Sequence, residues 1–328
     1  MLYIFFTFVA YTFSTAAAES VCEDVYPHLL LSSSQNEGVC ISTGGCWDAS
    51  KDVCYFPRVN GYEYTEIYKD DYELVGQLKL IESSGATVSP DFTDLSIIIQ
   101  QETKKRTHIR IYPTDTDRWQ IPQSVIPRPS DMVYDGSEGT ADTNVFIESS
   151  APLQFGIRRG SQLIFFMSKM LIFQDQYVQF VLASPSNVQQ SYGFGESSRK
   201  VSFIEPDTLY TMWNTDNFDS NFNSSLYGSH PFYIQVLDDG SAFGVMSMTC
   251  NAQTASMYNS DTNGDSVAFQ STGGIVDLYI FAGPSPSDVI AQYHTLIGRP
   301  MIPPYFSLGF HNSRWGYPDI QYVEEVVH

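Results

Sequence analysis

The residues most able to do chemistry in this sequence are adjacent carboxylates, because two acidic side chains held together can act as a general acid and a general base. Asp70-Asp71, Asp238-Asp239 and Glu324-Glu325 are three pairs of this kind. Neighbouring side chains on a strand or helix point in different directions, however, and acidic residues seldom lie in protein interiors. The spacing therefore predicts that all three pairs lie on the surface and that none is a catalytic pair.

Other catalytic and ligand-binding patterns are missing from the sequence. It has no Ser-His-Asp spacing, no HExxH or GxGxxG run, no phosphate-binding P-loop and no cluster with metal-ligand spacing. We therefore expect neither a cofactor nor a metal. His230 and His311 are expected to be hydrogen-bonded, partly buried rings with a structural role.

The charge of the chain limits its partners. Its 37 acidic and 17 basic residues give a formal net charge of −20, which repels a phosphate backbone, so nucleic acid is not an expected partner. The basic cluster Lys104-Lys105-Arg106 is expected to be a solvated turn between two strands. With 43% hydrophobic and 14% aromatic residues, the composition favours a folded, sheet-rich extracellular protein over a disordered one.

The first eighteen residues are typical of a secretory signal peptide. An apolar run from Met1 ends in the small residues Ala16-Ala17-Ala18 before Glu19, which predicts cleavage near Glu19 and an extracellular or lysosomal destination. The run begins without Lys or Arg, so the alternative is a signal anchor that stays in the membrane. Polar residues such as Thr7 within the run favour cleavage.

The cysteines indicate a small cross-linked module. Cys22, Cys40, Cys46 and Cys54 lie close together after the expected cleavage site, where an oxidising compartment converts cysteines to disulfides. Spacing alone leaves all three connectivities of four cysteines open. Cys250 stands among apolar residues and is expected to be a buried, inert thiol.

The elements between residues 61 and 298 are mostly short strands. Four runs at 95–99, 108–112, 162–166 and 177–181 have the alternating or apolar pattern of strands. Many short strands separated by Gly, Pro, Asn and Asp favour a β-sandwich.

Two helices are expected near the end of the chain. The first begins with Ser285 as its cap and Asp288 completing a capping box, has an apolar face that includes Val289 and Tyr293, and ends at Gly298. The run 303–311 is then expected to be a strand, and a second helix begins at about Asp319.

The region from Cys22 to Pro57 resembles a trefoil (P-type) domain. Gly44-Gly45-Cys46-Trp47 and Cys54-Tyr55-Phe56-Pro57 carry the likeness. Trefoils have six cysteines, and the four present here match the first, third, fifth and sixth, so the two that are missing form one whole bridge in the family. The resemblance implies the pairs Cys22–Cys46 and Cys40–Cys54.

Several motifs after residue 60 together resemble glycoside hydrolase family 31. Each motif is weak by itself, and their order along the chain makes them specific. They are Tyr192-Gly193-Phe194-Gly195-Glu196, Met212-Trp213-Asn214-Thr215-Asp216, Leu226 to Tyr233, Ser271 to Asp277, Gly298-Arg299-Pro300 and Arg314-Trp315-Gly316-Tyr317.

The resemblance implies a mainly β chain in four parts. These are a signal peptide (1–18), a small disulfide trefoil (19–58), a galactose-mutarotase-like β-sandwich (59–298) and the first strand and helix of an incomplete (β/α)8 barrel (299–328). Retaining glycosidases use two carboxyl groups about 5 to 5.5 Å apart. In this family both are aspartates on later barrel strands, beyond His328, so catalytic residues are not expected within this chain.

The resemblance to the family implies that two residues of this chain contact the sugar. Asp216 matches an aspartate that a sandwich loop extends into the sugar pocket, where it accepts hydrogen bonds from hydroxyls. Trp315 matches an aromatic residue beside the subsite for the terminal glucose, and it is expected to line a pocket with Asp216. Asn223-Ser224-Ser225 is an expected glycosylation site.

Two functions follow from these patterns. The first is the N-terminal part of a retaining α-glucosidase that acts on α-linked glucosides of the maltose type, inactive by itself and binding oligosaccharide only weakly. The alternative is a secreted, non-catalytic carbohydrate-binding or mucosal interaction protein built from a trefoil and a sandwich.

Overall fold

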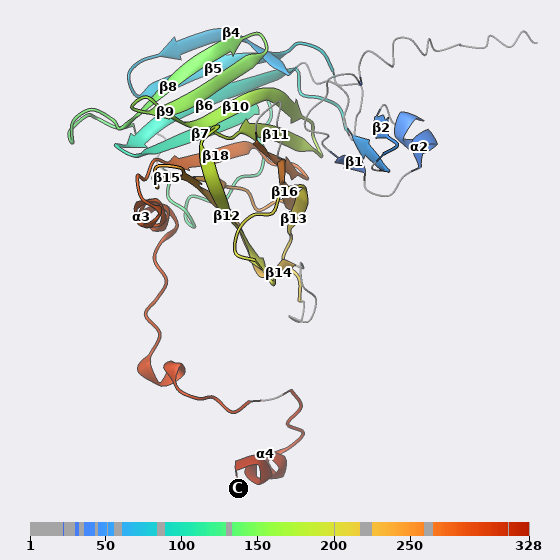
Figure 1. The fold of residues 1–328 in the computed structure, drawn as a ribbon, viewed down its shortest axis with the longest axis vertical. Helices are drawn as coiled ribbons and strands as arrows, with labels where there is room; N and C mark the ends of the chain where they lie inside the picture. Colours follow the sequence, from blue (N-terminus) through green and yellow to red (C-terminus); the bar gives the residue numbers. More distant parts are fainter. Residues whose placement is uncertain are drawn as a thin grey trace, which may run out of the picture.

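The fold is built from two packed β-sheets (Figure 1). The computed structural model describes residues 22, 30–32, 36–42, 45–50, 52–55, 61–83, 89–128, 133–199, 201–216, 225–258, 265–313 and 315–327. The expected signal peptide and the sequon at Asn223 lie outside these residues.

The larger sheet has eight antiparallel strands among the residues that the structure describes. Consecutive hairpins form one half of it, and β7 is joined to the other half through β18. In spatial order the strands are β12 (Val188–Ser197), β14 (Ser225–Leu237), β15 (Ala242–Ser247), β18 (Val276–Phe281), β7 (Arg106–Pro113), β6 (Asp94–Thr103), β5 (Glu73–Leu80) and β4 (Tyr62–Lys69).

The second sheet has seven strands in the described part of the chain. All four runs that the sequence analysis assigned to strands are strands in the structure, two in each sheet. In spatial order the second sheet consists of β13 (Thr208–Met212), β16 (Gln253–Tyr258), β17 (Ser266–Ser271), β11 (Val178–Ala183), β10 (Gln162–Phe173), β9 (Leu153–Arg159) and β8 (Thr143–Ser150).

The main hydrophobic core lies between the two sheets. Side chains alternate across a strand, so every second residue of β6, β7 and β18 points inward, for example Ile97, Ile109 and Leu278, each at most 1% exposed. Phe180 and Phe269 of the facing sheet meet them and stack on each other with centroids 5.2 Å apart. The expected mainly β sandwich is confirmed.

A small disulfide-linked module lies beside the sandwich. It contains β1 (Leu30–Ser32), α2 (Glu37–Ser42), β2 (Cys46–Asp48) and β3 (Val53–Tyr55), with β3 between the other two strands. Both bridges that the trefoil resemblance implies are present, Cys22–Cys46 and Cys40–Cys54. Cys46 and Tyr55 also pack against Met170, Ile172 and Val181 on the outer face of the second sheet, so the module is anchored to the sandwich.

Peptide mapping under non-reducing conditions is expected to recover these two bridges and a Cys250 that alkylates without reduction. Each bridge closes a short loop, with sequence separations of 24 and 14 residues, and should stabilise the module by about 2 to 4 kcal/mol. A bridge that includes Cys250 would contradict the assignment.

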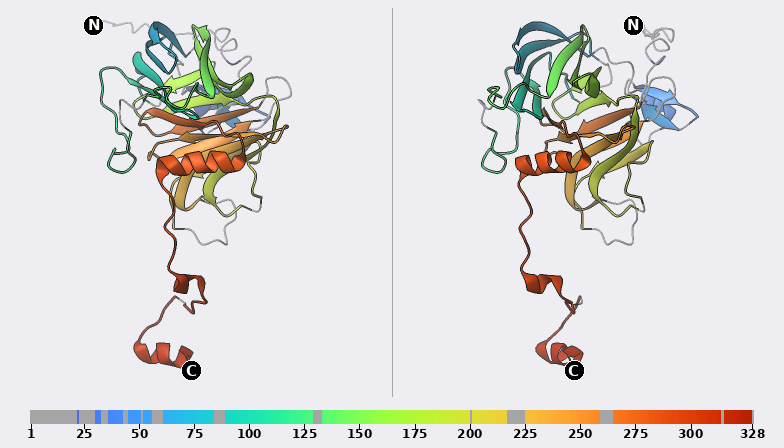
Figure 2. Two further views of the ribbon diagram at one scale, coloured as in Figure 1. Left: turned by 90° about the vertical axis from the view of Figure 1, so that its left-hand side faces the viewer. Right: turned by 60° about the vertical axis from the view of Figure 1, so that its left-hand side comes forward.

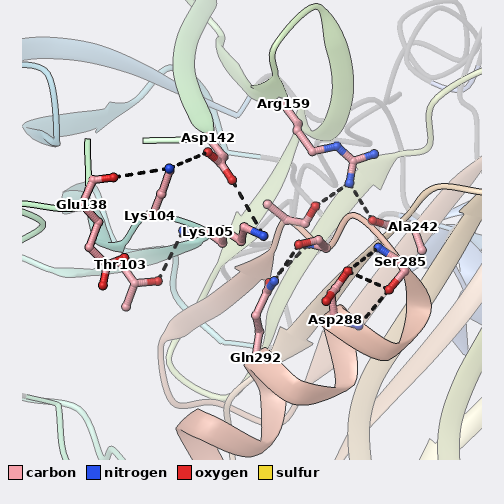
Figure 3. Close-up of polar contacts among 12 residues, drawn as sticks. Thr103, Lys104, Lys105, Glu138, Asp142, Arg159, Ala242, Ser285, Asp288 and Gln292 are labelled. Carbon is pink, nitrogen blue, oxygen red and sulfur yellow. Dashed lines mark hydrogen bonds and ion pairs between the residues drawn. The ribbon is translucent and has the colours of Figure 1, made fainter. Parts of the chain in front are cut away.

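Helix α3 (Pro286–Ile297) covers part of the outer face of the larger sheet (Figure 2). Its expected capping box is confirmed, because Ser285 Oγ accepts from the Asp288 amide at 3.1 Å and Asp288 Oδ2 accepts from the Ser285 amide at 3.1 Å (Figure 3). Val289 is fully buried and Tyr293 stacks on Phe232 at 4.2 Å. The apolar face of α3 therefore packs against β14 and β15.

Arg159 ties the two sheets together near the start of α3. From β9, its Nη1 donates to the carbonyl of Ala242 at 2.7 Å, and it also donates to the carbonyl of Ala282 (Figure 3). Burial lowers the pKa of the Arg159 guanidinium, and the negative charges of Asp239 and Asp142 oppose that effect.

The cluster Lys104-Lys105-Arg106 was expected to be a solvated turn, and the structure differs from that expectation at Arg106. Lys104 and Lys105 form a partly exposed turn and lie 3.8 and 4.0 Å from the carboxylate of Asp142 (Figure 3). Arg106 is only 6% exposed, because it begins β7 and its Nε donates to Glu102 Oε2 at 2.8 Å. The prediction of a solvated side chain was wrong for Arg106, since a buried carboxylate pairs with it across the hairpin.

That ion pair belongs to a buried polar network on the outer side of the larger sheet. His108 Nδ1 lies 2.9 Å from Glu102 Oε1, and its Nε2 lies 2.7 Å from Asp277 Oδ1. The imidazole also stacks on Tyr279 with centroids 4.1 Å apart. Both ring nitrogens face carboxylates, so the ring satisfies both only as a cation that donates from each nitrogen.

The chain beyond α3 leaves the sandwich (Figures 1 and 2). It contains a 3₁₀ helix, η1 (Tyr305–Leu308), and α4 (Ile320–Val327). The second helix is confirmed, but the strand expected at 303–311 is wrong. Among the described residues this run has no strand partner, and its amides bond locally instead, Ser307 to the Pro304 carbonyl at 2.9 Å and Gly309 to the Phe306 carbonyl at 3.1 Å.

Cys250 is exposed, which overturns the expectation of a buried thiol. Met246 and Met248 are buried beneath α3, but strand β15 ends at Ser247, so the alternation does not continue to Cys250. Within the described residues, none of the helices has the length and apolar character needed to cross a membrane.

Candidate functional site

Three of the sequence motifs meet at one end of the sandwich. Residues 192–196 lie in β12, residues 225–233 in β14, and residues 213–216 follow β13. Strands β12 and β14 pair at an edge of the larger sheet, and β13 is the edge strand of the second sheet. Figure 1 shows the three strands together on the side from which the C-terminal segment runs.

The first residues of β14 hold the segment that carries Asp216. Alternation along β14 places residues 225, 227 and 229 on one face. Each of these three side chains donates to the segment around β13, so the loop after β13 is held against β14. The pairs are Ser225 Oγ with the Thr211 carbonyl, Tyr227 Oη with Asp216 Oδ1 at 2.6 Å, and Ser229 Oγ with Asn214 Oδ1.

The polar wall formed by Asn214, Asp216, Tyr227 and Ser229 faces solvent. Asp216 and Asn214 are exposed, and Tyr227 is 63% exposed. The hydrogen bond to Asp216 and the negative charge of that carboxylate raise the pKa of the Tyr227 phenol. The tyrosine is therefore neutral, it holds the Asp216 carboxylate in place, and the remaining lone pairs of Asp216 can accept bonds from a ligand's hydroxyls.

The opposite face of β14 holds Glu196. Its Oε2 accepts from the Gly228 amide at 3.0 Å, and its Oε1 lies 3.8 Å from His230 Nε2. A Cβ at position 228 would lie 2.8 Å from Glu196 Oε1, so a side chain there would displace the Glu196 carboxylate. Position 193 requires glycine, because its φ is 147° and a Cβ there would lie 2.4 Å from the Phe232 carbonyl oxygen.

Trp315 lies apart from this wall. It is on the extended C-terminal segment, 97% exposed, so it contacts little of the protein. The structure thus gives Asp216 a defined place, whereas the pairing of Trp315 with Asp216 around a sugar stays a prediction for a chain that continues through a barrel.

The remaining candidates are surface residues. All six residues of the three adjacent carboxylate pairs are exposed, as predicted. His230 and His311 are also exposed, so the expectation of partly buried rings was wrong for both; His311 Nε2 lies 3.2 Å from the Phe306 carbonyl. Among the residues that the structure describes, no group of three or more His, Cys, Asp and Glu side chains is placed to hold a metal ion.

Sequence reasoning overlooked Tyr227 and Glu196 as individual residues. Both lie inside motifs that it had identified, but the motifs do not say which side chains meet. The signal that could have found Tyr227 is its alternation with Ser225 and Ser229 along β14, which predicts one shared polar face.

Comparison with known proteins identifies the family. Residues 81–254, more than half of the chain, match the glycosyl hydrolase 31 N-terminal galactose mutarotase-like domain. This part contains the polar wall and the strands that position it. The chain therefore belongs to glycosyl hydrolase family 31, of which it contains the N-terminal β-sandwich.

Curated relatives carry glycosidase names. A probable alpha-glucosidase of Oryza sativa subsp. japonica is 34% identical over 81% of this chain and 32% of its own length. An alpha-glucosidase of Hordeum vulgare is 33% identical over 75% and 29%, and alpha-xylosidase 1 of Arabidopsis thaliana is 31% identical over 84% and 32%. The chain thus spans about a third of the length of these relatives.

Solved structures share the fold. A glucosidase II alpha subunit with bound alpha3-Glc2 superposes with a TM-score of 0.66 at 15% identity, over 82% of this chain and 38% of that one. A Flavobacterium johnsoniae family 31 dextranase complexed with glucose gives 0.56 at 16% identity, over 77% and 30%.

Proposed function

We propose that this chain is the N-terminal part of a retaining α-glucosidase, in which it supplies one wall of the sugar pocket. The observation that carries the proposal is the polar wall itself, where three family motifs meet and Tyr227 holds the carboxylate of Asp216 at 2.6 Å. A fixed, exposed acceptor of this kind suits recognition of sugar hydroxyls. The proposed substrates are α-linked glucosides of the maltose type.

The remaining parts of the chain are assigned by resemblance. Residues 19–58 would be a trefoil, and residues 299–328 the start of a catalytic barrel that holds Trp315 beside the terminal glucose. The two disulfides fit entry into the secretory pathway, which residues 1–18 would direct, and Asn223 would carry a glycan.

The direct test is hydrolysis by a chain that continues into the family's catalytic domain. That chain should hydrolyse maltose with retention of configuration, and the 328-residue chain should not, because the family's two catalytic aspartates have no counterpart in it. A continued chain that binds maltose without turnover would favour the non-catalytic carbohydrate-binding alternative.

In the continued chain, Asp216→Ala is expected to lower kcat/KM for maltose, because it removes the acceptor on the polar wall. The loss of one hydrogen bond to a charged acceptor should cost about 1 to 3 kcal/mol of binding in the transition state, roughly five- to 150-fold in kcat/KM. Tyr227→Phe keeps the carboxylate but frees it to move, so its effect should be smaller and in the same direction.

Asp238→Ala is the matched control for these kinetics, since Asp238 is an exposed aspartate in the turn after β14. Its kcat/KM should equal that of the unmodified chain. Equal losses in Asp216→Ala and Asp238→Ala would remove Asp216 from the sugar pocket.

A further inference from the structure

A hollow lies on the other face of β14 from the polar wall. It has a volume of about 540 Å³ and is open to solvent, and its walls include Glu196, Arg199, Phe203, Tyr210 and Leu226. Leu226 and Gly228 alternate with Tyr227 along the strand, so the hollow and the Asp216 carboxylate lie on opposite sides of β14. A ligand here would not occupy the polar wall.

One side of the hollow offers an aromatic surface. Phe203 is 39% exposed although it is a large apolar residue, and it is held by its backbone to β12 through an antiparallel bridge with Tyr192, which is itself 40% exposed. An exposed ring fixed to a sheet edge provides a flat apolar surface, and a pyranose ring has an apolar face of matching size.

The lining of the hollow also offers hydrogen-bonding groups. Arg199 lies 3.9 Å from the centroid of Tyr210, its Nη2 donates to the Leu209 carbonyl at 3.1 Å, and its side chain is only 8% exposed. A guanidinium has five N–H groups, so donors remain beyond that bond. Glu196 is 45% exposed and retains free acceptor sites beside its bond from Gly228.

The charges around the hollow select a neutral ligand. The positive charge of Arg199 is balanced by Glu205, 3.8 Å away, and Glu196 adds a negative charge on the wall. The whole chain also carries a formal charge of −20. An anionic ligand would be repelled, whereas uncharged hydroxyls can use the donor and the acceptor together.

We propose that this hollow is a separate binding site for a neutral hexose oligosaccharide, with Phe203 as the stacking surface and Arg199 and Glu196 as the hydroxyl partners. Binding here needs no catalytic group and no residue of the polar wall. The site can therefore be tested on the 328-residue chain, and its failure would leave the proposed hydrolase function unaffected.

The test is a titration of the 328-residue chain with maltotriose, followed by ligand-observed NMR and calorimetry. The expected dissociation constant is millimolar, as is usual for a shallow site. Phe203→Ala should weaken binding about tenfold by removing the stacking surface, and Ser202→Arg should abolish it by filling the hollow. Ser202 is exposed, so this second variant tests the site even if Phe203→Ala folds poorly.

Three comparisons make the result specific. Tyr68→Ala removes another exposed aromatic ring, on β4 at the opposite edge of the same sheet, and should bind maltotriose normally. Asp216→Ala changes the polar wall and leaves the hollow intact, so this variant should also bind maltotriose normally. Trigalacturonate, of the same size but charged, should not bind.

The proposal is overturned if maltotriose shows no saturable binding. It is equally overturned if binding survives both Phe203→Ala and Ser202→Arg, or if Asp216→Ala abolishes it, because the sugar would then lie elsewhere.

Discussion

Replacing Asp277 with alanine is expected to destabilise the sandwich by about 3 to 5 kcal/mol, because it leaves the charge of His108 partly uncompensated in the interior. Asp277 and His108 are each 3% exposed, so water cannot replace the lost carboxylate. With His108 protonated, the two negative charges of Glu102 and Asp277 balance the two positive charges of His108 and Arg106. The measurement is the free energy of unfolding from urea titrations at constant pH.

Asp142→Ala is the matched control for this substitution. It also removes a carboxylate that faces cationic side chains, but the lysines lie 3.8 and 4.0 Å away and all three groups are partly exposed. Such a pair contributes about 0 to 1 kcal/mol. If the two variants lose the same stability, the buried network has no special role.

The same network predicts a pH dependence of the unmodified chain. Burial opposes the charge on His108, but its hydrogen bonds to Asp277 and Glu102 and their negative charges outweigh burial and raise its pKa above the ordinary 6.5. A raised pKa adds stability that is complete below about 6.5 and is lost as the pH rises through the folded-state pKa.

Glu102 contributes in the opposite direction. Burial favours its neutral form, yet the hydrogen bond and charge of His108 and the charge of Arg106 lower its pKa below the ordinary 4.5. Its contribution is complete above about 4.5 and is lost as the pH falls through the folded-state pKa. The network should therefore stabilise most between about pH 4.5 and 6.5, and His108→Gln should flatten the loss at higher pH. An unchanged profile in that variant would contradict this account.

The elements that the sequence predicted correctly are those fixed by local rules. The capping box of α3 involves Ser285 and Asp288, three residues apart, and the four predicted strands follow from short-range alternation. The disulfides followed from the trefoil resemblance rather than from spacing, which had left three connectivities open.

The features that the sequence could not predict depend on distant contacts. His108 and Asp277 are 169 positions apart, and nothing near either residue indicates that β7 and β18 are neighbours. The polar wall was predictable as a set of motifs but not as the pair of Tyr227 and Asp216, which depends on how the loop after β13 lies on β14. The strand expected at 303–311 also failed for a non-local reason, since a strand needs a partner.

The largest effect of a change in a sequence motif is expected at Phe194, between Gly193 and Gly195. Its ring is 2% exposed and lies 5.4, 5.5 and 5.8 Å from the rings of Tyr210, Tyr233 and Phe269, so it joins strands of both sheets. Phe194→Ala should cost about 3 to 5 kcal/mol through lost burial and the cavity that remains. Urea unfolding of this variant and of Phe203→Ala gives the comparison; Phe203 is partly exposed and should cost much less.

Two causes for the loss at Phe194 can be separated, because its φ is 60°, in the left-handed region that bulky residues rarely adopt. Alanine keeps that backbone cost, whereas glycine removes about 1 kcal/mol of it. If the ring supplies the stability, Phe194→Gly should also be strongly destabilised, yet at least as stable as Phe194→Ala, the reverse of their usual order in a strand. A glycine variant as stable as the unmodified chain would show that the ring contributes nothing.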